Sequence, residues 1–133
     1  MPHTVRDWMS SPVIVIDPDT SVSYAATLMR RRGIRSLVVD LTAEGGGYGI
    51  VTTTDISSKI FASDRDPAET KVSAIMTAPV VAGRADMTLK EASLLMHKRK
   101  FHHLPIVDEH GILVGIISDT DIFMAVEEIG WKK

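Results

Sequence analysis

The 133-residue sequence contains no cysteine, which excludes a disulfide framework and a thiolate metal site. The absence suits a reducing compartment, and we expect the protein in the cytoplasm. No apolar run approaches the roughly 18 residues that a membrane-spanning helix needs, and the first residues lack the apolar stretch of a signal peptide. Fifteen basic and seventeen acidic side chains nearly balance, so the basic excess typical of nucleic-acid-binding surfaces is missing.

The sequence contains an internal repeat. Equivalent residues lie 67 positions apart in the first part of each copy and 66 apart in the second, so one single-residue gap separates the two registers. Such a gap is tolerated best in a turn. The copies span residues 5–62 and 72–129, and the polar residues 63–71 form the predicted linker. The matched pairs include Val5/Val72, Met9/Met76, Pro12/Pro79, Ala25/Ala92, Met29/Met96, Gly49/Gly115 and Asp55/Asp121.

Each copy predicts the order β-α-β-β-α after a short helical stub. Apolar residues at helical spacing begin at Val22 and at Leu89, with Thr20 or Ser21 and then Thr88 as N-caps. One copy of about 60 residues would bury its surface poorly by itself, so the fold class is α/β with both copies in one compact domain. Strands are expected at residues 13–16, 37–41 and 49–51, and again at 80–82, 104–107 and 112–117.

Both copies place the same motif where a strand meets the final helix: GIVTTTDI at residues 49–56 and GIISDTDI at residues 115–122. In one interpretation Thr52 and Ser118 are N-caps, and Asp55 and Asp121 complete capping boxes. In the other, the helix N-terminus attracts a phosphate, the hydroxyl donates to it, and the carboxylate accepts from both ribose hydroxyls. The two interpretations are compatible, because a cap residue can also face a ligand.

This junction resembles that of the CBS-domain repeat, as do the segments MSSP (9–12), MTAP (76–79) and FHHLPIVD (101–108). The resemblance covers roughly residues 5–128. It implies a tandem pair, or Bateman module, with the repeats packed about a pseudo-two-fold axis. It further implies a non-catalytic regulatory role and an adenosyl ligand in the cleft between the repeats: AMP, ADP, ATP, NAD or S-adenosylmethionine. A homodimer and a separate effector protein are the expected partners.

The resemblance also implies which residues contact the ligand. It assigns ribose to Asp55 and Asp121, and phosphate to Thr52 and Ser118. The first copy departs from the pattern, since RSLV at residues 35–38 stands where the second has HHLP; whether both sites bind the same ligand is left open. The remaining contacts implied are adenine with the backbone near Val13, Ile14, Val80 and Val81, phosphate with Arg35, His102 and His103, and apolar flanking of the purine by Ile34, Phe101, Ile50 and Ile116.

Other functions find less support in the residues. His102 and His103 are adjacent at a strand start and should point to opposite faces, and no HxxxH or HExxH spacing occurs, so no metal site is predicted. The basic runs at residues 30–32 and 98–100 lack interleaved aromatics for base stacking, so we expect no nucleic acid. No catalytic motif is present. The alternative to a nucleotide sensor is a dimerisation or protein-interaction module with vestigial sites.

Overall fold

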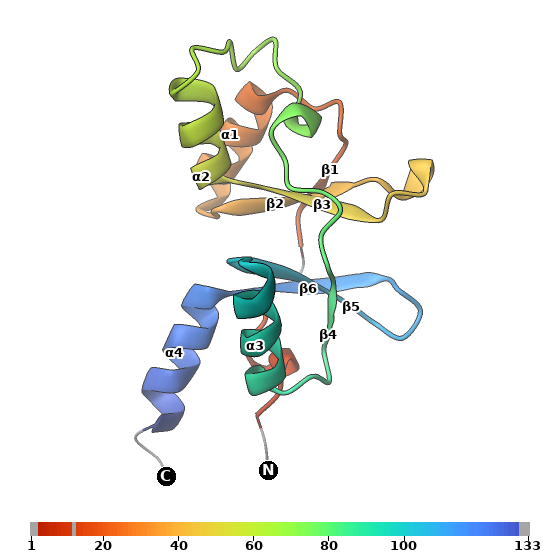
Figure 1. Cartoon of the computed structure of the whole chain (residues 1–133), viewed down its shortest axis with the longest axis vertical. Helices are drawn as coiled ribbons and strands as arrows, with labels where there is room; N and C mark the ends of the chain where they lie inside the picture. Colours follow the sequence, from red (N-terminus) through yellow and green to blue (C-terminus); the bar gives the residue numbers. More distant parts are fainter. Residues whose placement is uncertain (1–2, 12, 131–133) are drawn as a thin grey trace. The chain divides into compact units, whose positions relative to one another are not determined.

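The computed structural model describes residues 3–11 and 13–130, and the described chain forms two compact units (Figure 1). The continuous unit is Ile14–Val80, and the split unit combines Met1–Val13 with Val81–Lys133. The short segment that opens each sequence repeat therefore belongs with the sheet of the other repeat.

The continuous unit contains a three-stranded sheet in the order β1-β2-β3, in which β1 and β2 are parallel and β2 and β3 antiparallel. The β-α-β-β-α order predicted for the first copy is confirmed, with β1 shorter than expected. After Ile56 the last helix widens into a π-helical turn. The elements are β1 (Val15–Ile16), α1 (Val22–Arg32), β2 (Ser36–Asp40), η2 (Thr42–Glu44), β3 (Tyr48–Thr52), α2 (Thr53–Ile56), η3 (Ser57–Phe61) and η4 (Val72–Ala74).

The split unit repeats this topology in the order β4-β5-β6. The prediction of a strand at residues 80–82 was wrong: β4 lies at Gly83–Arg84. The backbone N–H of Val80 instead donates to the carbonyl oxygen of Tyr48 at 3.0 Å, which holds Val80 in the continuous unit. The elements are η1 (Val5–Asp7), β4, α3 (Leu89–Arg99), β5 (His103–Val107), β6 (Leu113–Ser118) and α4 (Asp119–Gly130).

The helix starts follow the predicted capping chemistry. The Ser21 hydroxyl accepts the N–H of Tyr24 at 3.1 Å at the start of α1. At the start of α3, Thr88 and Glu91 form a capping box. Both helices turn an apolar stripe inward. Among the residues that the structure describes, no helix has the length and apolar character needed to span a membrane.

Most of the buried apolar residues form one cluster in each unit. In both, the inward stripe of a helix packs on the strands beside it, which fixes the sheet under the helix. The continuous unit buries Val22, Ala25, Met29, Leu37, Val39, Val51 and Ile75 among others. The split unit buries Val5, Ala85, Ala92, Met96, Leu104, Ile106 and Ile117.

The glycine that opens each junction motif is required by a close backbone approach. Thr77 exchanges two 2.9 Å hydrogen bonds with Ile50, so its segment crosses β3 directly over Gly49. A Cβ atom built on Gly49 would lie 2.9 Å from the Met76 sulfur and 3.2 Å from the Thr77 carbonyl oxygen. Packing therefore requires glycine at this position, which lies on the same strand as Thr52 and three residues before it.

Candidate functional site

Two backbone contacts fix the orientation of the helix that follows each junction. In the continuous unit the N–H of Thr53 donates to the carbonyl oxygen of Arg35 at 3.0 Å. In the split unit the N–H of Asp119 donates to the carbonyl oxygen of His102, also at 3.0 Å. The strand therefore runs into the helix without a loop, beside the basic residue that precedes the neighbouring strand.

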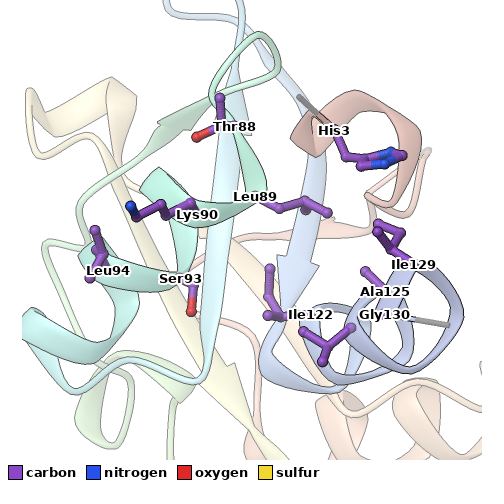
Figure 2. Close-up of a pocket in the computed structure, with 11 residues that line it drawn as sticks. His3, Thr88, Leu89, Lys90, Ser93, Leu94, Ile122, Ala125, Ile129 and Gly130 are labelled. Atoms are coloured by element: carbon purple, nitrogen blue, oxygen red, sulfur yellow. The ribbon is translucent and has the colours of Figure 1, made fainter. Parts of the chain in front are cut away.

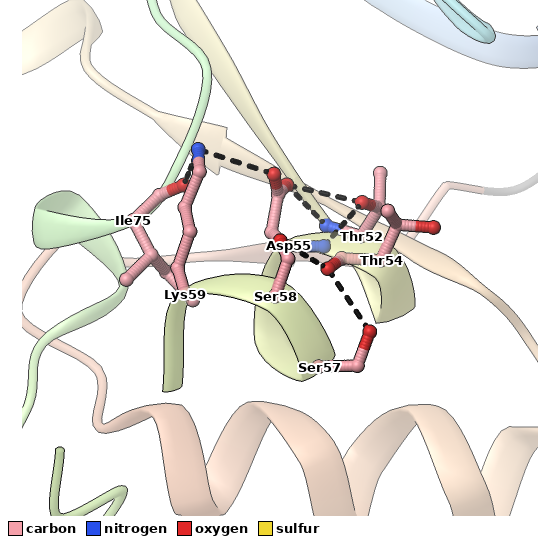
Figure 3. A network of polar contacts seen from close by, with 7 residues as sticks. All are labelled: Thr52, Thr54, Asp55, Ser57, Ser58, Lys59 and Ile75. Carbon is pink, nitrogen blue, oxygen red and sulfur yellow. Dashed lines mark hydrogen bonds and ion pairs between the residues drawn. The ribbon is translucent and has the colours of Figure 1, made fainter. Parts of the chain in front are cut away.

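Thr52 and Asp55 form the capping box at the first junction (Figure 3). The Oδ2 oxygen of Asp55 accepts the backbone N–H of Thr52 at 2.9 Å and the Thr52 hydroxyl at 3.0 Å. In return, the hydroxyl oxygen accepts the N–H of Asp55 at 3.1 Å. The capping interpretation of this motif is confirmed.

Ser118 and Asp121 repeat the arrangement at the second junction. Oδ2 of Asp121 accepts the N–H of Ser118 at 2.8 Å and its hydroxyl at 3.0 Å, while the hydroxyl oxygen accepts the N–H of Asp121 at 3.2 Å. Both carboxylates are thus held in the same orientation relative to their strands.

The capping boxes limit what each site can offer a ligand. An ionised carboxylate only accepts hydrogen bonds and has roughly two lone pairs on each oxygen. In both boxes Oδ2 already accepts two hydrogen bonds, so Oδ1 is the oxygen that can accept further donors. Each hydroxyl donates its single proton to the carboxylate, so a phosphate contact at Thr52 or Ser118 requires that hydroxyl to rotate.

Lys59, which the sequence did not indicate as a site residue, lies directly beside Asp55. Its Nζ atom is 3.3 Å from Oδ1 of Asp55, whose side chain is 14% exposed. The same Nζ donates to the carbonyl oxygen of Ile75 at 2.9 Å. The signal was present, because an acidic residue four positions before a lysine is a common helical ion pair.

The other residues predicted to contact the ligand divide between the two units. In the split unit Phe101 and His102 line one pocket of about 420 Å³ together with Asp119. His102 Nδ1 lies 2.7 Å from Asp119 Oδ2, and both side chains are exposed; Asp121 does not line this pocket. The continuous unit holds Ile14, Ile34, Arg35, Ile50 and Val80, and the split unit holds Val13, Val81, His103 and Ile116.

Two carboxyl groups with lowered pKa values lie at the hairpin turns of the two sheets. The Thr42 hydroxyl and N–H lower the pKa of Asp40, and the N–H of Ile112 is the main cause of the lowered pKa of Asp108. Within residues 3–11 and 13–130, no group of three or more His, Asp and Glu side chains could hold a metal ion.

Comparison with known proteins identifies the repeat. The CBS-domain profile matches residues 5–62 and 72–128. The CBS domain-containing protein YhcV of Bacillus subtilis is 34% identical over 119 residues, which cover 90% of this chain and 82% of that protein.

Two solved structures with this fold contain ligands. The CBS domain pair of protein MJ0100, in complex with 5′-methylthioadenosine and S-adenosyl-L-methionine, is 28% identical with a TM-score of 0.82 over all of both chains. CBSX2 in complex with AMP is 26% identical with a TM-score of 0.75, covering 96% of this chain and 98% of its own.

Proposed function

Because this chain belongs to the CBS-domain family and carries two copies of the domain, we propose that it is a regulatory ligand-binding module and not an enzyme. Its ligand is an adenosyl small molecule such as AMP, ADP, ATP, NAD or S-adenosylmethionine. A separate effector protein reads the bound state. Ligand that binds one conformation better than another shifts the population toward it, and the effector responds to that shift.

The observation that carries the proposal is the paired junction. Asp55 and Asp121 each keep one carboxylate oxygen, Oδ1, outside the hydrogen bonds of the capping box. A ribose carries two adjacent hydroxyl donors, so an acceptor-only carboxylate is its chemical complement. The adenosyl ligands of the MJ0100 pair and of CBSX2 support the same ligand class.

A second role, self-association, is favoured by a groove between α3 and α4 (Figure 2). The groove has a volume of about 500 Å³ and is lined largely by apolar side chains. Leu94 and Val126, on its two sides, are 60% and 65% exposed, an arrangement that leaves apolar surface for a partner. We propose that a second copy of the chain covers this groove in a homodimer.

The ligand proposal is tested by thermal-shift and calorimetric titration of the purified, nucleotide-free protein. AMP, ADP, ATP, NAD and S-adenosylmethionine are screened, and a saturating rise in Tm identifies the ligand. Asp55→Ala and Asp121→Ala follow. Loss of a hydrogen bond to a charged group weakens binding by roughly 10- to 150-fold.

Glu91→Ala is the matched control. It removes the carboxylate of the capping box at Thr88, which lies outside the two junctions. It should lower stability by about 1 kcal/mol, as a lost cap does, with ligand affinity unchanged. Absence of any shift with all five ligands, or unchanged affinity in both aspartate variants, would refute the proposal and favour an interaction module alone.

A further inference from the structure

The two junctions share their capping boxes but differ one helical turn later. Asp55 is followed four positions on by Lys59, whereas Asp121 is followed at the same spacing by Ala125. Lys59 lies on the π-helical turn η3 and is half-exposed. Ala125 lies in the uninterrupted helix α4 and is buried.

Lys59 is held between two acceptors of the continuous unit (Figure 3). One is Oδ1 of Asp55 at 3.3 Å. The other is the carbonyl oxygen of Ile75 at 2.9 Å, in the segment that leads to Thr77, which pairs with Ile50 of β3. The ammonium group is therefore anchored to the backbone as well as to the carboxylate.

The position of the Lys59 ammonium is important because only one oxygen of the Asp55 carboxylate lies outside the capping box. Oδ2 of Asp55 is already engaged by the N–H and hydroxyl of Thr52. Lys59 thus takes a lone pair of the one oxygen that a ribose could use. At Asp121 the corresponding alanine has no donor to place there.

We propose that Lys59 is an internal competitor for the ribose-binding oxygen of Asp55, so that an uncharged adenosyl ligand fills the Asp121 site first. This inference rests on the proposed function of both aspartates. Because Oδ1 has about two lone pairs, it can accept both ribose hydroxyls only after the ammonium has left it.

The test uses 5′-methylthioadenosine, which has a ribose and no phosphate. Removing the Lys59 charge therefore cannot weaken binding through a lost phosphate contact. Isothermal titration compares the wild type with Asp55→Asn, Asp121→Asn, and Asp121→Asn combined with Lys59→Met. Methionine keeps the length of the lysine stem without its charge, and the thermal midpoint of each variant reports that it is folded.

As single substitutions, Asp121→Asn should abolish the tighter of the two binding events, and Asp55→Asn should leave the affinity of that event unchanged. In the Asp121→Asn background, Lys59→Met should tighten the remaining site by about tenfold or more, the effect of one hydrogen bond to a charged group. Lys71→Met is the matched control, since Lys71 pairs with Asp19 in the same unit and should change nothing.

Two results would overturn the inference while leaving the proposed function intact. One is tight binding that is lost in Asp55→Asn instead of Asp121→Asn. The other is an Asp121→Asn, Lys59→Met protein that binds no better than Asp121→Asn alone. If no variant and no wild-type protein bound any adenosyl ligand, the proposed function would fail, and this inference with it.

Discussion

Replacing Gly115 by alanine tests the backbone crossing that positions the second junction. Ser10 and Ile116 exchange hydrogen bonds of 2.8 and 3.0 Å, so the segment that includes Met9 lies over β6. A Cβ atom on Gly115 would lie 2.6 Å from the sulfur of Met9 and 3.0 Å from the carbonyl oxygen of Ser10. The methionine side chain can move, but the carbonyl is held by the bridge.

The loss of stability in Gly115→Ala depends on which of these two contacts can be relieved by a movement of the neighbouring atoms. Overpacking a filled site lowers the free energy of unfolding by about 1–3 kcal/mol. Because the Ser10 carbonyl cannot move away, we expect Gly115→Ala to show a loss within this range. For a chain of this size the loss corresponds to a fall in Tm of roughly 4 °C for each kcal/mol. Truncating Met9 to alanine in the same protein should recover part of the loss, because it removes the closest contact.

Urea unfolding of wild type, Gly115→Ala and Gly130→Ala provides the measurement. Gly130 is the control, because a Cβ atom built there meets nothing within 4 Å. Since Gly130 also lines the groove between α3 and α4, all variants are compared in the Val126→Asp background, where its substitution should leave the free energy of unfolding unchanged or raised. A Gly115→Ala protein as stable as Gly130→Ala would refute the proposed role of the crossing.

Three further predictions concern the surface and the turns. Val126→Asp should convert a dimer to a monomer in light scattering, whereas Ile112→Asp, at an exposed site outside the groove, should not; a protein monomeric from the start would contradict the homodimer. Lys59→Met should lower the free energy of unfolding by less than about 1 kcal/mol, since the lysine is half-exposed and an ion pair open to solvent on one side contributes little, and a larger loss in urea unfolding would show a structural role. The lowered pKa of Asp108 means that its contribution to stability is present above its unfolded pKa and is lost as the pH falls through the lower folded value. Asp108→Ala should therefore reduce the loss of stability below about pH 4, which thermal melts across that range would measure.

The sequence predicted those parts of the fold that depend on local chemistry. The spacing of Val22, Ala25 and Met29 located α1, and Thr88 capped α3 as expected. The strand predicted at residues 80–82 failed because its hydrogen bonds are set by a partner far away in the chain: Val80 pairs with Tyr48. The residues around Val80 contain no pattern that would indicate Tyr48 as the hydrogen-bond partner.

The candidate site was predictable to the level of its motif and no further. The motif identified Thr52 and Asp55 and their capping geometry, because a capping box is a contact between residues three positions apart. It could not show that Oδ2 of Asp55 would accept both hydrogen bonds from Thr52, which leaves Oδ1 to accept donors from a ligand. It also could not show that Lys59 would reach both that oxygen and the carbonyl of Ile75, sixteen residues away.

Positions that match between the two copies and positions that differ have different physical causes. Gly49 and Gly115 are identical because each lies under a crossing backbone that leaves no room for a side chain. Lys59 and Ala125 differ in a way that packing alone does not require, since the lysine is half-exposed and we expect its ion pair to contribute little to stability. We expect that a half-exposed side chain in contact with the remaining oxygen of Asp55 can be replaced with little loss of folding stability but with a change in ligand affinity. If the two aspartates bind ligand as proposed, the difference between the copies at this position predicts unequal ligand affinity at the two sites.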